Sequence, residues 1–331
     1  MNQLSPLPVS EEPSTEDTQH QQSVEEAVVH QQIILEFSSI VGQNLAVSLL
    51  KGAIAKQHIA PAYLFAGPKG VGKSLTAKCF LAEALSIHNL ANHPDLLWVE
   101  PTYLHQGQLL GESELAGAGV QPKSAPQIRI EQIREITQFL SCSPLAAPCK
   151  AVVIEDAEKI GANAANALLK TLEEPTSGTI ILLCDLPQRL LPTITSRCQP
   201  IPFYRLSCAQ MTTTLKKLGQ KGILSNPTVM MMAAGSPGQA IAHHNYLKCI
   251  PQSLLEQLTT PFSSPLDALN IAKEIEAMLE FHQQLWLLDY LQQCWRYLGS
   301  GDWLSKLEEA KAALLNASPR LVWEVLLLQN S

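Results

Sequence analysis

Short apolar runs alternate with longer amphipathic segments along the first two thirds of the chain. Four runs have the length and composition of buried strands, and they cover residues 63–66, 93–99, 151–154 and 179–184. A strand that is covered on both faces has a continuous apolar run rather than an alternation of apolar and polar residues. Because helical segments separate these runs, the pattern predicts an α/β fold with a doubly wound parallel sheet.

Helices are predicted over residues 44–57, before the first strand, and between later strands from 128 onward and over 162–172. In the first of these helices, we expect the apolar contacts to come from Leu45, Val47, Leu49 and Leu50. A long insertion occupies residues 89–127. Its polar, glycine-rich part at 107–127 is predicted to be a surface loop.

From about residue 206 the strand pattern ceases. Residues 206–248 predict small helices and residues 264–298 and 304–328 predict longer ones, with Pro261 and Pro265 flanking an expected linker. At the other end, residues 1–34 are rich in Ser, Pro, Glu and Gln, which predicts a disordered acidic tail. The predicted organisation is therefore a tail at 1–34, an α/β domain at 35–205, a small helical lid at 206–262 and an all-helical C-terminal domain at 263–331.

Composition narrows the class of protein. The chain has 331 residues, of which 46% are hydrophobic and 16% charged, so two or three domains with substantial cores are expected. No apolar run could span a bilayer and no secretory signal is visible, so we expect a cytoplasmic protein without membrane contacts. The net charge of −7 arises in the first 50 residues, which hold seven acids and no Lys or Arg. A balanced remainder argues against a free-standing nucleic-acid binder, so DNA would be met as part of a larger assembly.

Residues 67–74 satisfy the pattern G-x-x-x-x-G-K-[ST] without a mismatch. This pattern is typical of a P-loop, whose glycines let backbone N–H groups curl around a phosphate. Lys73 would reach the β- and γ-phosphates, and the helix that begins near Ser74 would direct the positive end of its dipole at the same anion. The strand before the loop and the helix after it disfavour the alternative, an ordinary glycine-rich turn. The candidate nucleotide-binding residues are Gly67, Pro68, Lys69, Gly70, Val71, Gly72, Lys73, Ser74, Leu75 and Glu155.

Two acids, Glu155 and Asp156, follow the apolar run at 151–154. They would lie at the carboxyl edge of the sheet, where ligands bind in such folds. We expect ATP as the nucleotide, Ser74 and Glu155 as Mg²⁺ ligands, and Asp156 as a weak candidate for orienting a water. The usual order is Asp and then Glu, so the second acid is here one methylene shorter, and hydrolysis is expected to be weak or absent. The alternative is a strand-to-helix turn with solvated acids.

Residues 196–198 read Ser-Arg-Cys. This segment resembles the S-R-C signature of the clamp-loader ATPases, a branch of the AAA+ family. The resemblance implies that Arg197 is an arginine finger that acts in trans on the nucleotide of a neighbouring subunit. A planar, permanently charged guanidinium suits the charge that develops on a transferring γ-phosphoryl group. Without the resemblance, Arg197 would be interpreted as a surface or ion-pair residue.

The resemblance covers nearly the whole chain after residue 36. Residues 37–43 are similar to the segment at the nucleotide's edge in this family, and residues 166–175 to a stretch shared by bacterial clamp-loader subunits. Residues 93–95, 128–136 and 235–238 point more narrowly to the delta-prime subunits of DNA polymerase III. Motor subunits of the gamma/tau type carry an arginine where Gly238 stands, and that arginine senses the γ-phosphate.

The delta-prime resemblance implies an AAA+ domain, a lid and a helical collar domain in a mainly structural subunit. It also implies a hetero-pentamer with delta and gamma/tau subunits, which loads a sliding clamp on primed DNA. The alternative is an ATP-hydrolysing motor subunit of the gamma/tau type, which the unbroken P-loop favours. A P-loop kinase or an unrelated NTP-binding switch is a third hypothesis, against which the S-R-C segment and the helical C-terminal half count.

Zinc is not expected. Many relatives carry a four-cysteine zinc module after the P-loop helix, but residues 86–93 contain no cysteine. The eight cysteines of the chain include no C-x-x-C pair, so four convergent zinc ligands are not indicated. We interpret them as scattered buried thiols.

Overall fold

A computed structural model describes residues 35–87, 90, 92–111, 114, 125–174, 178–259, 264–298 and 301–329. The tail at 1–34 lies outside the described residues, so its disorder stays a prediction. Within the described ranges, every helix is too short or too polar to cross a membrane.

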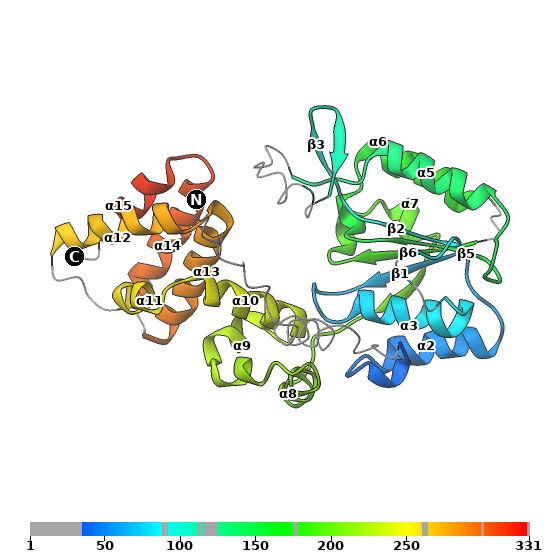
Figure 1. The fold of residues 1–331 in the computed structure, drawn as a ribbon, viewed down its shortest axis with the longest axis horizontal. Coiled ribbons are helices and arrows are strands. Elements are labelled where there is room, and N and C mark those ends of the chain that lie inside the picture. Colours follow the sequence, from blue (N-terminus) through cyan, green and yellow to red (C-terminus); the bar gives the residue numbers. More distant parts are fainter. Residues whose placement is uncertain are drawn as a thin grey trace, which may run out of the picture. The chain divides into compact units, whose positions relative to one another are not determined.

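Figure 1 shows the central sheet of the α/β part. Its five parallel strands have the order β2-β5-β6-β1-β7. The strands are β1 (Ala62–Ala66), β2 (Leu96–Val99), β5 (Lys150–Ile154), β6 (Gly178–Cys184) and β7 (Gln199–Pro202). All four predicted runs form strands, which confirms the predicted parallel sheet. The pattern missed β7, because its sequence QPIP has a proline at every second position. Those prolines are tolerated because β7 lies at the edge of the sheet, next to β1.

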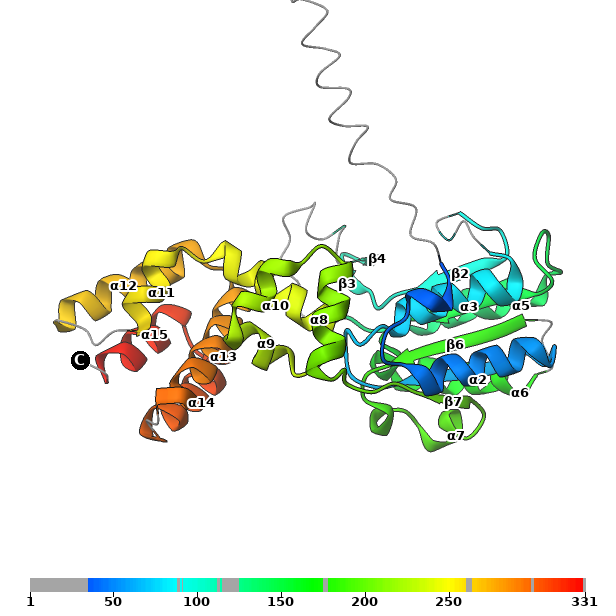
Figure 2. The same cartoon turned by 90° about the horizontal axis from the view of Figure 1, so that it is seen from below.

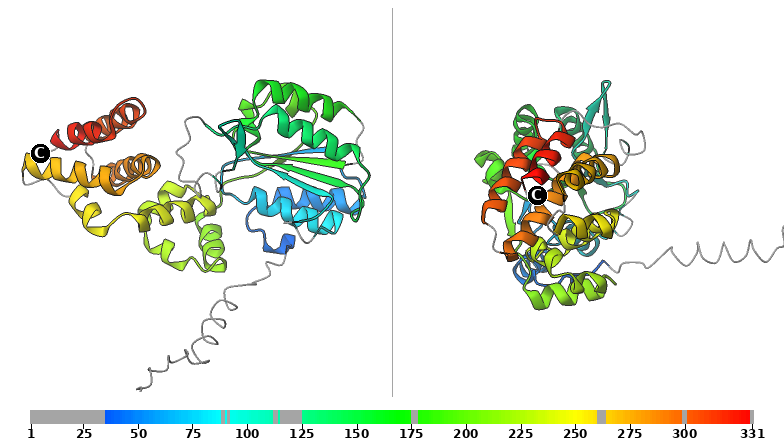
Figure 3. Two further views of the ribbon diagram at one scale, coloured as in Figure 1. Left: turned by 45° about the horizontal axis from the view of Figure 1, so that its top comes forward. Right: turned by 90° about the vertical axis from the view of Figure 1, so that its left-hand side faces the viewer.

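Helices cover both faces of this sheet, as the edge-on view in Figure 3 (left) shows. The helices are α2 (Asn44–Ala55), α3 (Lys73–Leu85), α5 (Ile130–Ser141), α6 (Ala162–Glu173) and the short α7 (Pro192–Thr195). Side chains of β1 alternate between the faces: Tyr63 and Phe65 pack with α2 and α3, and Ala62 and Leu64 pack with α5, α6 and α7. Because both faces are apolar, the strands have continuous apolar runs.

The buried side of α2 differs from the prediction. Ala46 and Leu50, one turn apart, face the core and are fully buried. Leu45 and Leu49 are also one turn apart, but they are 48% and 40% exposed. The prediction of apolar contacts is therefore wrong for these two residues, whereas Leu50 lies in the core and Val47 packs against it.

The insertion after α3 contains a hairpin. β3 (Tyr103–His105) and β4 (Gln108–Leu110) pair antiparallel, so the prediction of a surface loop at 107–127 is wrong at its start. The turn residues 106 and 107 have φ angles of 49° and 84°, which suit a two-residue hairpin turn. Residues 127 and 128 form isolated β-bridges, and α5 therefore begins two residues later than predicted.

After β7 the described chain is helical. The helices of this part are α8 (Cys208–Lys217), α9 (Pro227–Ala233), α10 (Pro237–Cys249), α11 (Gln252–Thr259), α12 (Pro265–Met278), α13 (Phe281–Leu298), α14 (Gly301–Leu314) and α15 (Pro319–Leu328), together with the 3₁₀ helix η4 (Lys221–Ser225). Three further 3₁₀ helices precede β7: η1 (Phe37–Ser39), η2 (Ala157–Lys159) and η3 (Pro187–Arg189). α8, α9 and α10 lie side by side (Figure 2) and share a small core, and α11 to α15 share a larger one. The helices predicted at 264–298 and 304–328 are each divided in two, and Pro319 at the start of α15 marks the second break. The predicted domain boundaries stay predictions.

Asp95 explains why the HPD segment at 93–95 matters for the fold. Its carboxylate is fully buried and accepts backbone N–H bonds from Leu145, Ala146 and Ala147 at 2.7, 2.6 and 2.8 Å. Burial alone would raise the pKa of Asp95, but these hydrogen bonds outweigh it and the pKa is lowered. Asp95 therefore holds the loop between α5 and β5 in place as an ionised group.

The cysteines are less uniform than expected. Cys79, Cys184 and Cys198 are buried, but Cys142, Cys208 and Cys249 are exposed, so the interpretation as buried thiols is wrong for these three.

Candidate functional site

The predicted P-loop connects β1 to α3, and Lys73 is the first residue of that helix. Its N-cap is Gly72, which supplies no side-chain hydrogen bond to the first N–H groups of α3. The loop, the ends of β5 and β6, and the start of α10 line a pocket of about 370 Å³. The predicted residues that reach this pocket are Lys69, Gly70, Gly72, Lys73, Ser74, Leu75, Glu155 and Asp156. Uncapped N–H groups beside a pocket fit the phosphates of a nucleotide.

Lys73 is buried and fully engaged within the chain. Its Nζ donates to the carbonyl oxygens of Gly67 and Pro68 at 2.7 and 2.8 Å and to Asp185 Oδ1 at 2.6 Å. A lysine ammonium has three N–H donors, so all three are used. Gly67 and Pro68, two of the predicted nucleotide-binding residues, therefore contact Lys73 through their carbonyl oxygens.

Glu155 lies where a magnesium ligand was predicted. Ser74 Oγ and Trp98 Nε1 both donate to Glu155 Oε1, each at 3.2 Å. Burial raises the pKa of Glu155, the negative charge of Glu100 acts in the same direction, and the two hydrogen bonds oppose both. A bound cation would relieve this penalty, so the pair of Ser74 and Glu155 fits Mg²⁺.

The second acid, Asp156, has a left-handed backbone with φ of 46°. Its Oδ2 accepts a hydrogen bond from Lys159 Nζ at 2.7 Å. Carboxylate oxygens of Asp156, Glu158 and Asp185 lie within 4.8 Å of one another. The carboxyl edge of the sheet thus carries more negative charge than the two predicted acids alone.

The start of α10 packs directly on the P-loop. Ser236 Oγ donates to the carbonyl oxygen of Lys69 at 2.7 Å, and Gly238 N donates to that of Gly70 at 2.9 Å. A Cβ atom at Gly238 would lie 2.8 Å from Gly70 Cα, so a side chain at this position cannot fit without moving the backbone. On the other side of the loop, the Gln43 side chain donates to the carbonyl oxygens of Val71 and Tyr204 at 3.2 and 2.7 Å.

Arg197 is not among the residues that line the described P-loop pocket. Its Nη2 pairs with Glu173 Oε1 at the end of α6 at 2.5 Å, and its Nη1 donates to the Thr193 carbonyl oxygen at 2.8 Å. The guanidinium side chain is 35% exposed. The next residue, Cys198, is buried in the sheet core, and burial raises the pKa of this thiol to about 11. The core thus anchors the chain beside a half-exposed arginine.

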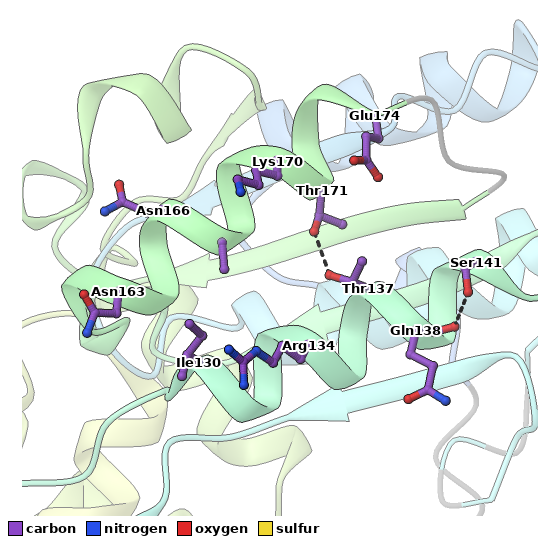
Figure 4. Close-up of a pocket in the computed structure, with 11 residues that line it drawn as sticks. Ile130, Arg134, Thr137, Gln138, Ser141, Asn163, Asn166, Lys170, Thr171 and Glu174 are labelled. Carbon is purple, nitrogen blue, oxygen red and sulfur yellow. Dashed lines mark hydrogen bonds between the residues drawn. The ribbon is translucent and has the colours of Figure 1, made fainter.

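A second, larger hollow of about 650 Å³ lies between α5 and α6 (Figure 4). Arg134 and Gln138 line it from α5, and Asn166 and Lys170 line it from α6. A hydrogen bond of 2.9 Å between Thr137 and Thr171 joins the two helices at its floor.

Sequence reasoning missed Asp185, Gln43, Ser236 and Trp98. Asp185 had a usable signal, since it follows the buried run at 179–184 just as Glu155 follows the run at 151–154. Gln43 and Ser236 lie in the segments 37–43 and 235–238 that carry the family resemblance, but no site role was predicted for either residue. Tertiary contacts bring Gln43, Ser236 and Trp98 to the loop and its pocket.

A parallel sheet of this order, with a P-loop after β1 and a helical segment seated on that loop, defines a P-loop protein of the AAA+ class. Residues 42–207 match the family described as DNA polymerase III, delta subunit. Residues 209–330 match the family described as cyanobacterial DNA polymerase III delta prime, C-terminal domain. Because the first match spans half of the chain, this chain belongs to the DNA polymerase III delta subunit family.

Curated relatives agree with this assignment. The chain is 35% identical over 181 residues to DNA polymerase III subunit delta' of Bacillus subtilis, covering 50% of this chain and 48% of the relative. It is 36% identical over 159 residues to subunit delta' of Pseudomonas aeruginosa, covering 43% and 42%. Subunit tau of Bacillus subtilis is 29% identical over 55% of this chain and 31% of its own length. The chain thus spans less than half the length of these relatives, and the predicted delta-prime resemblance is confirmed.

Among solved structures, a DNA polymerase III gamma subunit-related protein from Thermotoga maritima superposes with a TM-score of 0.55. The match covers 86% of this chain and 98% of that chain at 16% identity. At this identity, the likeness concerns the fold alone. It confirms the predicted fold class, an α/β domain followed by helical segments.

Proposed function

We propose that this chain is the delta-prime-type subunit of a DNA polymerase III clamp loader and that it supplies Arg197 to the ATP site of a neighbouring subunit. In this role its own P-loop binds nucleotide but contributes little hydrolysis. The observation that carries the proposal is the contact between Gly238 and Gly70. A Cβ at Gly238 would lie 2.8 Å from the Gly70 backbone, so this pocket has no room for the arginine that motor subunits place there.

The residues of the pocket are suited to holding a nucleotide. The uncapped N–H groups at the start of α3 would bind phosphate oxygens, and Ser74 and Glu155 would hold Mg²⁺. Bound MgATP would supply the phosphoryl group for hydrolysis. Asp156, the candidate for orienting water, is engaged by Lys159, which supports a weak catalytic role at most.

The surroundings of Arg197 support a role outside its own pocket. The guanidinium is half-exposed and held by Glu173 and the Thr193 carbonyl, while buried Cys198 fixes the backbone. A charged fork held in this way can be transferred from Glu173 to a phosphate on another subunit. The partners would be delta and gamma/tau subunits in a hetero-pentamer, which acts on a sliding clamp and primed DNA.

The proposal is tested by reconstituting the loader with its partner subunits and following single-turnover ATP hydrolysis. An arginine finger increases the rate at the site it serves by about 10³–10⁵, so Arg197→Ala should remove the hydrolysis phase of one site. Nucleotide binding by the isolated chain should not change. Arg197→Lys is the matched control, since it keeps the charge but loses the planar fork. A trace identical to that of the wild type would refute the role of Arg197.

The second candidate is a motor subunit of the gamma/tau type. The intact P-loop and the hydrogen bond between Ser74 and Glu155 favour it. Robust ATPase activity of the isolated chain, abolished by Lys73→Ala, would establish the motor and reject the structural subunit.

A further inference from the structure

We propose that Asp185 sets the nucleotide selectivity of the P-loop, by occupying Lys73 and making the site favour a nucleoside diphosphate over a triphosphate. The inference rests on the proposed nucleotide site. Asp185 is neither part of the loop nor one of the two predicted acids, Glu155 and Asp156.

The first step is the state of Lys73. All three of its N–H donors are filled at 2.6–2.8 Å by Gly67, Pro68 and Asp185, and its side chain is 7% exposed. Any new anion must therefore displace one of these acceptors. The two carbonyl oxygens belong to the loop backbone, so the partner that can be displaced is Asp185.

The second step is the fixed position of Asp185. Gly67 N donates to the carbonyl oxygen of Cys184 at 3.1 Å, and Asp185 N donates to Glu158 Oε2 at 3.1 Å. Both bonds are made by the peptide group between Cys184 and Asp185, so the backbone that leads into Asp185 is held beside the start of the loop. Its side chain is 18% exposed and lines the pocket, so a displaced carboxylate would remain there.

The third step is the charge balance. Asp185 lies within a cluster of carboxylates with Asp156 and Glu158, and Lys159 pairs with Asp156. A further anionic group beside Lys73 would meet the negative charge of Asp185. Lys69 also lines the pocket, but among the described residues no ion pair joins it to Asp185 or to the other carboxylates of the cluster. Like charges brought together in a partly buried site repel strongly.

These steps affect the phosphates of a nucleotide differently. In a P-loop, backbone N–H groups hold the α- and β-phosphates, and the lysine side chain reaches the β- and γ-phosphates. Asp185 leaves the N–H groups at the start of α3 free but takes the lysine. The γ-phosphate of a triphosphate therefore loses most of its stabilising contact with Lys73, and a diphosphate, which has no γ-phosphate, loses less binding free energy.

The test is calorimetric titration of the full chain with Mg·ADP and with the non-hydrolysable triphosphate Mg·AMP-PNP. Asp185→Asn should improve triphosphate affinity relative to diphosphate affinity by about tenfold or more, since it removes the repelling charge. Asp156→Asn is the matched control. It removes a charge from the same cluster without touching Lys73, and Asn tolerates the left-handed backbone at this position. Its affinity ratio should shift by less than that of Asp185→Asn.

Two further variants make the result decisive. Adding Lys73→Ala to Asp185→Asn should abolish the gain, because the gain depends on releasing Lys73. Asp185→Ser serves in place of Asp185→Asn if thermal unfolding shows that the asparagine variant is not folded. An unchanged ratio in a folded variant, or an equal gain with Asp156→Asn, would overturn the inference. If no chain binds either nucleotide, this inference and the nucleotide site both fail, while Arg197 keeps its own test in the loader.

Discussion

Replacement of Asp95 by asparagine should lower the free energy of unfolding by about 3–5 kcal/mol. The buried carboxylate accepts one N–H bond on Oδ1, from Leu145, and two on Oδ2, from Ala146 and Ala147. An asparagine has one acceptor oxygen. If that oxygen keeps the two bonds of Oδ2, its amide group faces the N–H of Leu145, donor against donor.

The magnitude follows from these contacts. A hydrogen bond to a charged acceptor contributes about 1.5–3 kcal/mol, and a buried donor left without a partner costs about 1–3 kcal/mol more. The remaining two bonds also weaken, because their acceptor is no longer charged. Partial relaxation of the loop at 145–147 would recover some of this free energy, so we expect the total loss not to exceed about 5 kcal/mol.

Urea unfolding followed by circular dichroism measures this change. The control is Asp267→Asn on α12, where the aspartate is exposed and we expect a loss below about 1 kcal/mol. A change below 1 kcal/mol for Asp95→Asn itself would show that the three hydrogen bonds do not stabilise the fold as argued.

The same residue predicts a pH dependence. Its folded pKa lies below the unfolded value of about 3.9, so its stabilisation is complete above that value. The stabilisation is lost as the pH falls through the folded pKa. Asp95→Asn should remove this part of the acid sensitivity, which a series of urea midpoints in the acid range would reveal.

Two other predictions concern α10. Gly238→Ala should destabilise the protein by about 1–3 kcal/mol, because its Cβ would meet the Gly70 backbone at 2.8 Å. Gly52→Ala in α2, where nothing lies within 4 Å, should be neutral or stabilising in the same thermal unfolding assay, and equal effects would contradict the argument. Trp286 Nε1 donates to His243 Nδ1 at 2.8 Å, and burial lowers the pKa of His243 against the opposing charge of Asp289. The stability from this bond is complete above the unfolded pKa of about 6.5 and is lost as the pH falls through the lower, folded pKa of His243. His243→Gln keeps an acceptor but does not titrate, so its urea midpoints should decline less than those of the wild type below a pH of about 6.5.

Features that depend on a contiguous stretch of residues were predictable. The P-loop is such a feature, because eight consecutive residues contain its glycines, its lysine and its hydroxyl. The buried strands are another, because a strand covered on both faces needs an unbroken apolar run. The edge strand β7 and the hairpin β3–β4 lack such a run, and both were missed.

The sequence by itself therefore determined the parallel sheet, the phosphate-binding loop and the family. Only the tertiary structure decided the electrostatic state of that loop. Lys73 and Asp185 are 112 positions apart, and they meet because β6 lies beside β1. Gly238 reaches Gly70 because α10 is seated on the loop. Local periodicity records which face of an element is buried, but it holds no information on which distant carboxylate will lie beside a buried lysine.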